Sequence, residues 1–280
     1  MPVFNNKPHS NGAGSVTLVG AGPGDPELLT LRAVRALQEA DVILIDNLVA
    51  PAILDFARRE AKKMMVGKTG YGPSCRQDEI NVMMISLAKS GKRVVRLKGG
   101  DPMIFGRAGE EIAACRAAGI PVEVVPGITT AQAAASRLGV SLTQRELARR
   151  VQYITAHGAN GRLPSDIDWR SVADPSTTTV VYMPKRTLAE LAATALAHGI
   201  APDTPAIAVA SATRPDEQVV NATIATIAAK LADAAPSGPV LVMIGHALGV
   251  ALEAASKDDG AAAETQPVSE RPIAKHNLAL

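Results

Sequence analysis

The stretch VTLVGAGPGDPELLTLRAVRAL, residues 16–37, decides the fold class. It begins as an apolar, β-branched run, passes through a turn rich in glycine and proline, and continues with helical spacing. The stretch VVRLKGGDPMIFGRAGEE, residues 94–111, repeats this order. Further apolar runs begin at residues 42, 122, 151, 178, 206 and 240. Because these runs are apolar on both faces and alternate with helical segments, we predict an α/β protein whose strands are covered on both sides.

The length of 280 residues, with a mass of 29.0 kDa, fits one large domain or two modest ones. A connector around residues 140–148 separates two sets of strands. We therefore expect an N-terminal α/β domain at 15–144 and a C-terminal α/β domain at 145–255, with a ligand cleft between them. The polar or Ala/Gly/Pro-rich ends, residues 1–14 and 256–280, read as flexible tails.

The composition excludes several classes of function. Lys and Arg number 29 and Asp and Glu 27, so the net charge is only +2 and no chain-wide field attracts nucleic acid. The two cysteines and five histidines lack metal-ligand spacing, so we expect no bound metal. No secretory signal is visible, and no stretch reaches the roughly 20 apolar residues of a membrane span. We expect a cytoplasmic protein without nucleic-acid or membrane partners.

The first glycine-rich turn, GAGPGD at residues 20–25, superficially resembles a dinucleotide-binding loop. It departs from that pattern, because Asp25 replaces the third glycine and Pro23 removes a backbone N–H. Asp25 and Pro26 instead favour a helix start, with Asp25 as the N-cap. In the helix that follows, the spacing places Leu31, Val34 and Leu37 on one apolar face.

Three strand ends carry glycine or proline immediately after the apolar run. They are the loops that begin at Gly20, at Gly99 and at Pro126, and the last leads into a helix capped by Thr129 or Thr130. Such loops gather at the carboxyl edge of a sheet, where open α/β sheets bind ligands. Bare backbone groups suit a neutral adenosine or amino-acid moiety better than a phosphate.

Seven stretches are specific enough to indicate a family: GAGPGDPELLTLRAVRAL, VILIDNLV, RVVRLKGGDP, IFGR, VVPGIT, VYM and ATRPDEQVV. Together they resemble the tetrapyrrole methylases, and within these the uroporphyrinogen-III C-methyltransferases. The resemblance covers about residues 16–249. It implies two α/β domains, a homodimer, S-adenosylmethionine as methyl donor with S-adenosylhomocysteine as product, and a tetrapyrrole substrate. The implied reaction is the double methylation of uroporphyrinogen III to precorrin-2, in sirohaem or cobalamin biosynthesis.

The resemblance also assigns roles to individual positions. Asp46 matches the proposed general base of the family and Lys68 its proposed proton donor. The positions that match cofactor-binding residues are Pro23, Gly99, Gly100, Asp101, Ile104, Thr129, Thr130, Met183 and Ala212. Arg107 falls where the family has an arginine near the substrate, and we add Arg145 and Arg149 as candidates, because a substrate with eight carboxylates calls for arginine forks.

Some positions depart from the family pattern. Asn47 stands where an arginine usually follows the catalytic aspartate, Thr69 replaces another arginine, and Ala212 replaces a glycine. Three other functions therefore stay open. They are methylation of a different precorrin, a catalytically silent S-adenosylmethionine-binding protein, and a dinucleotide oxidoreductase, against which Asp25 and Pro23 argue.

Overall fold

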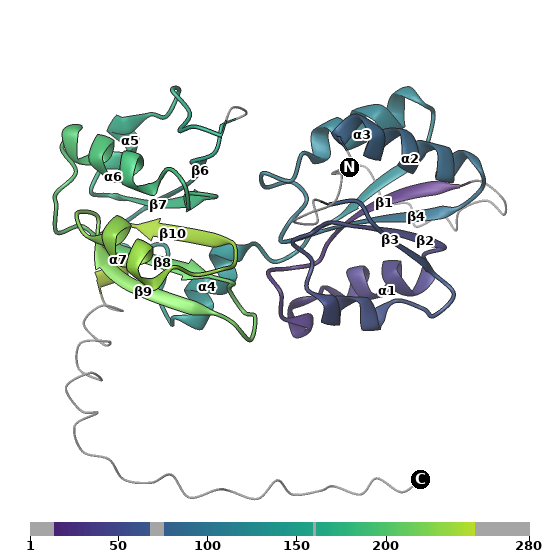
Figure 1. The fold of residues 1–280 in the computed structure, drawn as a ribbon, viewed down its shortest axis with the longest axis horizontal. Helices are drawn as coiled ribbons and strands as arrows, with labels where there is room; N and C mark the ends of the chain where they lie inside the picture. The colour runs from purple at the N-terminus through teal and green to yellow at the C-terminus, as the bar shows by residue number, and fades with distance from the viewer. Residues whose placement is uncertain (1–13, 68–75, 159–160, 250–280) are drawn as a thin grey trace, which may run out of the picture.

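The first sheet consists of five parallel strands. The computed structural model describes residues 14–67, 76–158 and 161–249 (Figure 1). The strands are placed side by side in the order β3-β2-β4-β1-β5, and every neighbouring pair is parallel. Their bounds are β1 Ser15–Gly20, β2 Val42–Ile45, β3 Lys62–Met65, β4 Arg93–Lys98 and β5 Val122–Val125.

Helices cover both faces of this sheet (Figure 1). On one face, α1 (Leu31–Glu39) and the 3-10 helix η2 (Pro51–Phe56) pack against Val19, Ile43 and Leu97. On the other face, α2 (Gln77–Lys89) and α3 (Ala108–Ala117) pack against Leu18, Leu44 and Val94. The two-sided burial confirms the expectation drawn from the apolar runs.

The start of α1 differs from its predicted packing. A short 3-10 helix, η1 (Pro26–Leu28), precedes it, and the Asp25 side chain caps η1 as predicted by accepting from the Glu27 amide at 2.9 Å. Leu31, however, is 76% exposed, whereas Ala33 and Leu37 are buried. The prediction that Leu31 belongs to the buried face is wrong, because the residues that meet the sheet follow the spacing 33, 37 and 40.

The second sheet is mixed. Its order is β6-β7-β10-β8-β9, and only β6 and β7 pair in parallel. The bounds are β6 Arg150–Thr155, β7 Thr177–Tyr182, β8 Pro205–Ala210, β9 Gln218–Thr223 and β10 Val240–Ile244. Its core on one side is formed with α5 (Trp169–Ala173), α6 (Leu188–Ala197) and α7 (Ile227–Ala234). The fold class, two α/β domains, is as predicted.

Helix α4 (Thr130–Arg137) packs against the opposite side of the second sheet (Figure 1). Its buried alanines Ala131, Ala134 and Ala135 contact a core that includes Ile207 and Met243. The helix therefore follows β5 in the sequence but contributes to the second core. The predicted domain boundary between residues 144 and 145 stays a prediction. In the packing of the core, the chain passes from the first sheet to the second before α4 begins.

The sequence patterns missed two strands, β3 and β9, which are both at sheet edges. Strand β3, with the sequence KKMM, has no buried residue, and β9 buries only Ala222. An edge strand that is largely exposed shows no apolar run, so its pattern is weak. After β10 the chain continues as the 3-10 helix η3 (His246–Leu248), and the predicted tails are outside the described residues except for Gly14.

Candidate functional site

The three loops predicted to gather at the carboxyl edge of the first sheet are bonded to one another. The Gly22 amide donates to the Gly100 carbonyl at 3.2 Å, and the Gly100 amide donates back to the Gly22 carbonyl at 2.7 Å. The Asp101 carboxylate accepts from the Gly127 amide at 2.9 Å. These bonds join the loops after β1, β4 and β5 into one backbone platform.

Glycine is required where these loops approach each other. A Cβ atom at Gly20 would lie 2.5 Å from the Gly127 amide nitrogen, and one at Gly127 would collide with the Gly100 carbonyl oxygen. Gly22 and Gly100 adopt φ angles of +70° and +67°, which favour glycine. Steric closeness and backbone conformation together explain the glycines of the GAGPGD and KGGDP stretches.

A cavity opens on this platform, and residues of both sheets line it. All nine positions predicted for the cofactor are among its lining residues, namely Pro23, Gly99, Gly100, Asp101, Ile104, Thr129, Thr130, Met183 and Ala212. Asp46 also lines the cavity. The cavity includes residues that the sequence did not single out, namely Leu48, Lys98, Phe105, Tyr182 and Arg214. The predicted cleft between the two α/β units therefore exists.

Backbone strain is concentrated around this cavity. In the described ranges, six non-glycine residues have positive φ, and five of them lie in loops at the cavity: Phe105, Arg107, Met183, Ser211 and Thr213. Such conformations persist only where the surrounding structure enforces them, and they cluster at ligand-binding sites. The strain therefore supports a functional role for this cavity.

The loop after β8 connects the second sheet to the first. The Thr213 hydroxyl accepts from the Asp25 amide at 3.0 Å. The Arg214 guanidinium donates to the Pro23 carbonyl at 3.4 Å and also to the Leu48 carbonyl. These bonds hold the two halves of the cavity wall together. The only sequence signal for Arg214 is its place in ATRPDEQVV, one of the stretches that carry the family resemblance.

An aromatic wall closes the cavity on the side of the second sheet. The ring of Tyr182 contacts Phe105 with centroids 5.1 Å apart and Tyr153 at 5.8 Å. Burial raises the pKa of the Tyr182 phenol, and the Ala131 amide and the Thr129 hydroxyl nearby partly offset this increase. The phenol oxygen is buried, and no described residue forms a well-aligned hydrogen bond with it.

Asp46 follows β2 directly, at the edge where the cavity opens. Its amide donates to the Leu97 carbonyl at 3.0 Å, which continues the pairing of β2 with β4. One carboxylate oxygen accepts from the Asn47 amide at 2.7 Å, and the other lies 3.7 Å from a guanidinium nitrogen of Arg96. The side chain is 30% exposed. The carboxylate is thus held locally and remains open to a molecule in the cavity.

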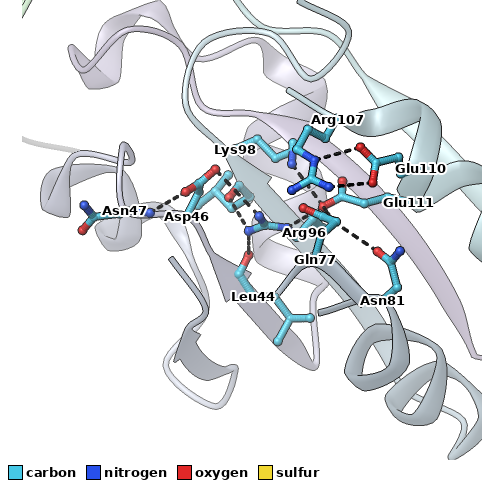
Figure 2. A network of polar contacts seen from close by, with 11 residues as sticks. Leu44, Asp46, Asn47, Gln77, Asn81, Arg96, Lys98, Arg107, Glu110 and Glu111 are labelled. Carbon is cyan, nitrogen blue, oxygen red and sulfur yellow. Dashed lines mark hydrogen bonds and ion pairs between the residues drawn. The ribbon is translucent and has the colours of Figure 1, made fainter. Parts of the chain in front are cut away.

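Two cations of β4 are buried beside Asp46. Arg96 and Lys98 alternate with Leu97, so both point to the face covered by α2 and α3, where each bonds to the Glu111 carboxylate (Figure 2). Burial lowers the pKa of Lys98, and Arg96 adds to this effect, while Glu111 and Asp46 oppose it. The alternation R-L-K was visible in the sequence, but nothing there shows that both side chains are buried.

The other predicted residues are Lys68, Arg107, Arg145 and Arg149, and the last three are not among the residues that line the cavity. Lys68 is outside the described residues. Arg107 is mainly exposed and pairs with Glu110 at 2.7 Å, one residue beyond Gly106 of the cavity wall. Arg149 donates to the Arg145 carbonyl at 2.9 Å, and both side chains are exposed before β6. The roles of these four residues stay predictions.

Within the described ranges, no helix combines the length and the apolar character needed to cross a membrane. The same ranges hold no group of three or more His, Cys, Asp or Glu side chains that could bind a metal ion.

The family model "Tetrapyrrole (Corrin/Porphyrin) Methylases" matches residues 15–228, which is most of the folded chain. The chain belongs to the tetrapyrrole methylase family. A uroporphyrinogen-III C-methyltransferase of Paracoccus denitrificans is 46% identical over 244 residues, which cover 87% of this chain and 85% of that protein. A siroheme synthase of Methylococcus capsulatus is 48% identical over 237 residues, 85% of this chain and 50% of that protein. The chain therefore spans about half the length of the siroheme synthases it matches.

Solved structures of other tetrapyrrole methylases have the same fold. The uroporphyrin-III C-methyltransferase of Thermus thermophilus, crystallised with S-adenosylhomocysteine, superposes with a TM-score of 0.72 at 38% identity, over 85% of this chain and 100% of that one. A cobalt precorrin-4 methyltransferase superposes with a TM-score of 0.75 at 27% identity, over 84% of this chain and 95% of that one. The fold is thus shared with family members whose names give different substrates.

Proposed function

We propose that this protein is an S-adenosylmethionine-dependent C-methyltransferase that converts uroporphyrinogen III to precorrin-2. The observation that carries the proposal is the cavity at the carboxyl edge of the first sheet. A bare-backbone platform and a carboxylate, Asp46, meet there. The relatives of the same name and the neighbour bound to S-adenosylhomocysteine support the choice of reaction.

The residues of the cavity fit S-adenosylmethionine. A Cβ atom at Gly100 would meet only the Thr130 hydroxyl, at 3.9 Å, so the glycine leaves room for a ligand against the backbone. Among the described residues, the buried Tyr182 phenol has only weak contacts with the Ala131 amide and the Thr129 hydroxyl, and a polar group of a ligand would satisfy it better. When bound, the cofactor supplies an electrophilic methyl group on a sulfonium. The platform, together with Met183 and Ala212, would hold and orient it.

Asp46 is the residue that would handle the proton. Attack by a pyrrole carbon on the methyl group forms a C–C bond and leaves the electron pair of the broken S–C bond on sulfur. The methylated macrocycle must then lose a proton, which requires a positioned base. The Asp46 carboxylate is held by the Asn47 amide and faces the cavity, so it would accept this proton. Lys68 stands at the position of the family's proposed proton donor.

The substrate's carboxylates need cationic partners. We propose that Arg107, Arg145 and Arg149 contact them, because these exposed guanidinium groups offer bidentate forks. We also propose that the protein acts as a homodimer in the cytoplasm. Sedimentation equilibrium would show twice the mass of 29.0 kDa, and a monomer at assay concentration would contradict the dimer.

The decisive experiment incubates the purified protein with labelled S-adenosylmethionine and enzymatically prepared uroporphyrinogen III under reducing conditions. Mass spectrometry of the tetrapyrrole then counts the methyl groups added. The proposal expects a product with two new methyl groups. Cofactor binding without methylation of this substrate would contradict it and would favour another precorrin or a silent binding protein. Binding of NADH in place of S-adenosylmethionine would favour the oxidoreductase.

A further inference from the structure

Glu111 is a fully buried carboxylate that no part of the proposed chemistry uses directly. Its side chain is 0% exposed. Three donors converge on its Oε1 atom: Arg96 Nε at 3.0 Å, Lys98 Nζ at 3.1 Å and Gln77 Nε2 at 3.1 Å (Figure 2). These donors come from β4 and α2, while Glu111 itself stands in the first turn of α3, where the helix dipole favours an anion.

A contribution to fold stability does not by itself explain why Arg96, Lys98 and Glu111 are buried together. Burying Arg96, Lys98 and Glu111 together removes three charges from water, and the interior attraction only partly compensates for that loss. Apolar residues of similar volume would fill the same space at least as well. The second oxygen, Oε2, is buried without a hydrogen-bond partner among the described residues. Such a cluster beside a ligand cavity is better explained by what it holds in place.

Arg96 links this carboxylate to the catalytic side. Its Nε atom bonds to Glu111, its Nη1 atom donates to the Leu44 carbonyl at 3.3 Å, and its Nη2 atom lies 3.7 Å from the Asp46 carboxylate (Figure 2). The guanidinium is planar and rigid, so fixing the Nε edge also fixes the direction of Nη2. A shift of Glu111 would therefore move the cation that faces Asp46.

Lys98 is the second cation that bonds to Glu111. Its ammonium group bonds to the same oxygen of Glu111, and the residue lines the cavity. Without Glu111, Arg96 and Lys98 would be two buried cations of β4 side by side with no shared counter-ion. Both would then have to rearrange, toward solvent or toward Asp46.

We propose that Glu111 is a positioning residue for methyl transfer, which acts through Arg96 to hold the Asp46 carboxylate in its reactive orientation. This inference rests on the proposed function. Glu111 touches neither cofactor nor substrate, and its effect passes through the guanidinium of Arg96.

The test is a double-mutant cycle on the full chain with Glu111→Gln, Arg96→Lys and the double variant. Glu111→Gln keeps the shape of the side chain but removes its charge. Its kcat should fall roughly 100-fold, as expected when a catalytic group is misplaced. The Kd for S-adenosylhomocysteine by calorimetry and the KM for the tetrapyrrole should stay within about threefold of wild type.

Coupling distinguishes positioning from a merely structural role. Because Arg96→Lys loses the rigid fork, the double variant should be no slower than Arg96→Lys alone. Additive losses in the cycle would overturn the inference, and so would a Glu111→Gln enzyme with wild-type kcat. Glu123→Gln, an exposed glutamate of β5 in the same domain, is the matched control and should behave as wild type.

Two further results keep the test decisive. If Glu111→Gln does not fold, Gln77→Ala removes one neutral donor from the same carboxylate and should lower kcat by roughly threefold with KM unchanged. Wild-type kcat in that variant would overturn the inference. If the wild-type protein itself adds no methyl group to uroporphyrinogen III, the proposed function fails instead, and the double-mutant cycle is not reached.

Discussion

The two ends of β2 each carry an aspartate beside an arginine of β4, and their environments differ. At the amino end, Asp41 bonds to the Arg93 guanidinium and amide and to Arg58. At the carboxyl end, the Asn47 amide is the only group of the described residues within hydrogen-bond distance of the Asp46 carboxylate, while Arg96 is 3.7 Å away. One carboxylate is saturated with partners, and the other is supported but left open.

The pKa of the first aspartate reflects this saturation. Hydrogen bonding from Arg93 lowers the pKa of Asp41 to about 2, although burial acts in the opposite direction. An aspartate bound so firmly ties β2 to β4 and has no capacity left for a ligand. The difference favours a role in stability for the amino end of this parallel sheet and a role in chemistry for its carboxyl end, where open α/β sheets usually bind ligands.

The largest expected effect comes from the open aspartate. Asp46→Asn keeps the size of the side chain and the contact with the Asn47 amide but removes the proposed base. We expect kcat for tetrapyrrole methylation to fall about 10²- to 10⁴-fold, with the melting temperature unchanged. Steady-state kinetics and thermal melting measure the two quantities. An Asp46→Asn enzyme with near-normal kcat would remove the distinction between the two ends.

A second variant tests the backbone platform at the same carboxyl end. In Gly127→Ala, the new methyl group collides with the Gly100 carbonyl oxygen and pushes the loops after β4 and β5 apart. We expect a loss of about 1–3 kcal/mol in the free energy of unfolding and a clearly weaker affinity for S-adenosylhomocysteine. Gly119→Ala, where the Cβ position is open, is a control for cofactor affinity, although its φ of +69° adds strain. Unchanged affinity in Gly127→Ala would show that the platform does not bind the cofactor.

The link between the two sheets should give a smaller effect. Arg214→Ala removes the bonds to the Pro23 and Leu48 carbonyls and leaves two carbonyls at the cavity rim without this partner. Hydrogen bonds from charged donors contribute about 1.5–3 kcal/mol, and these are partly exposed, so we expect cofactor affinity to fall about tenfold. Calorimetry with S-adenosylhomocysteine measures the change. Equal affinity in wild type and Arg214→Ala would mean that the bonds of Arg214 do not contribute to cofactor binding.

The smallest effect is expected at the amino end, and only on stability. The folded-state pKa of Asp41 is about 2, below the unfolded value near 3.9, so its contribution is complete above the unfolded pKa and disappears as pH falls toward 2. Solvent screens this ion pair because the Arg93 side chain is 45% exposed, so we expect a contribution of about 1 kcal/mol to the unfolding free energy at neutral pH.

Urea unfolding of wild type and Asp41→Asn at pH 7 and pH 3 measures this contribution. The difference in unfolding free energy should shrink at the lower pH, and kcat should be the same in both proteins. A variant with normal stability but impaired catalysis would reverse the roles assigned to the two ends.

Much of the site could be predicted from local sequence. The alternation of apolar runs and helical spacing located eight of the ten described strands. Six of these eight are largely buried, and a strand buried on both faces has a continuous apolar run. The same order placed Gly99, Gly100 and Pro23 at one edge. The strand-end position of Asp46 and the resemblance to the family indicated its place at the cavity.

Other features depend on contacts between distant parts of the chain. The sequence shows Arg96, Lys98 and Glu111 as charged residues of the kind usually found on a surface, whereas the structure buries all three. The packing of α4 on the second sheet was equally invisible, because a run of alanines fits either core. Arg214 had no local feature that pointed to the Pro23 loop, 191 residues away.

The amino-acid sequence alone determined the α/β alternation, the glycine turns at the strand ends and the capping residue Asp25, since these depend on near neighbours in the chain. It narrowed the second cap to Thr129 or Thr130, and in the structure Thr129 is the cap. Only the tertiary structure decided which aspartate of β2 is saturated and which stays open, and that one buried glutamate holds two cations of β4. The physical reason is that burial and ion pairing are set by residues brought together from different helices and strands, which no local pattern records.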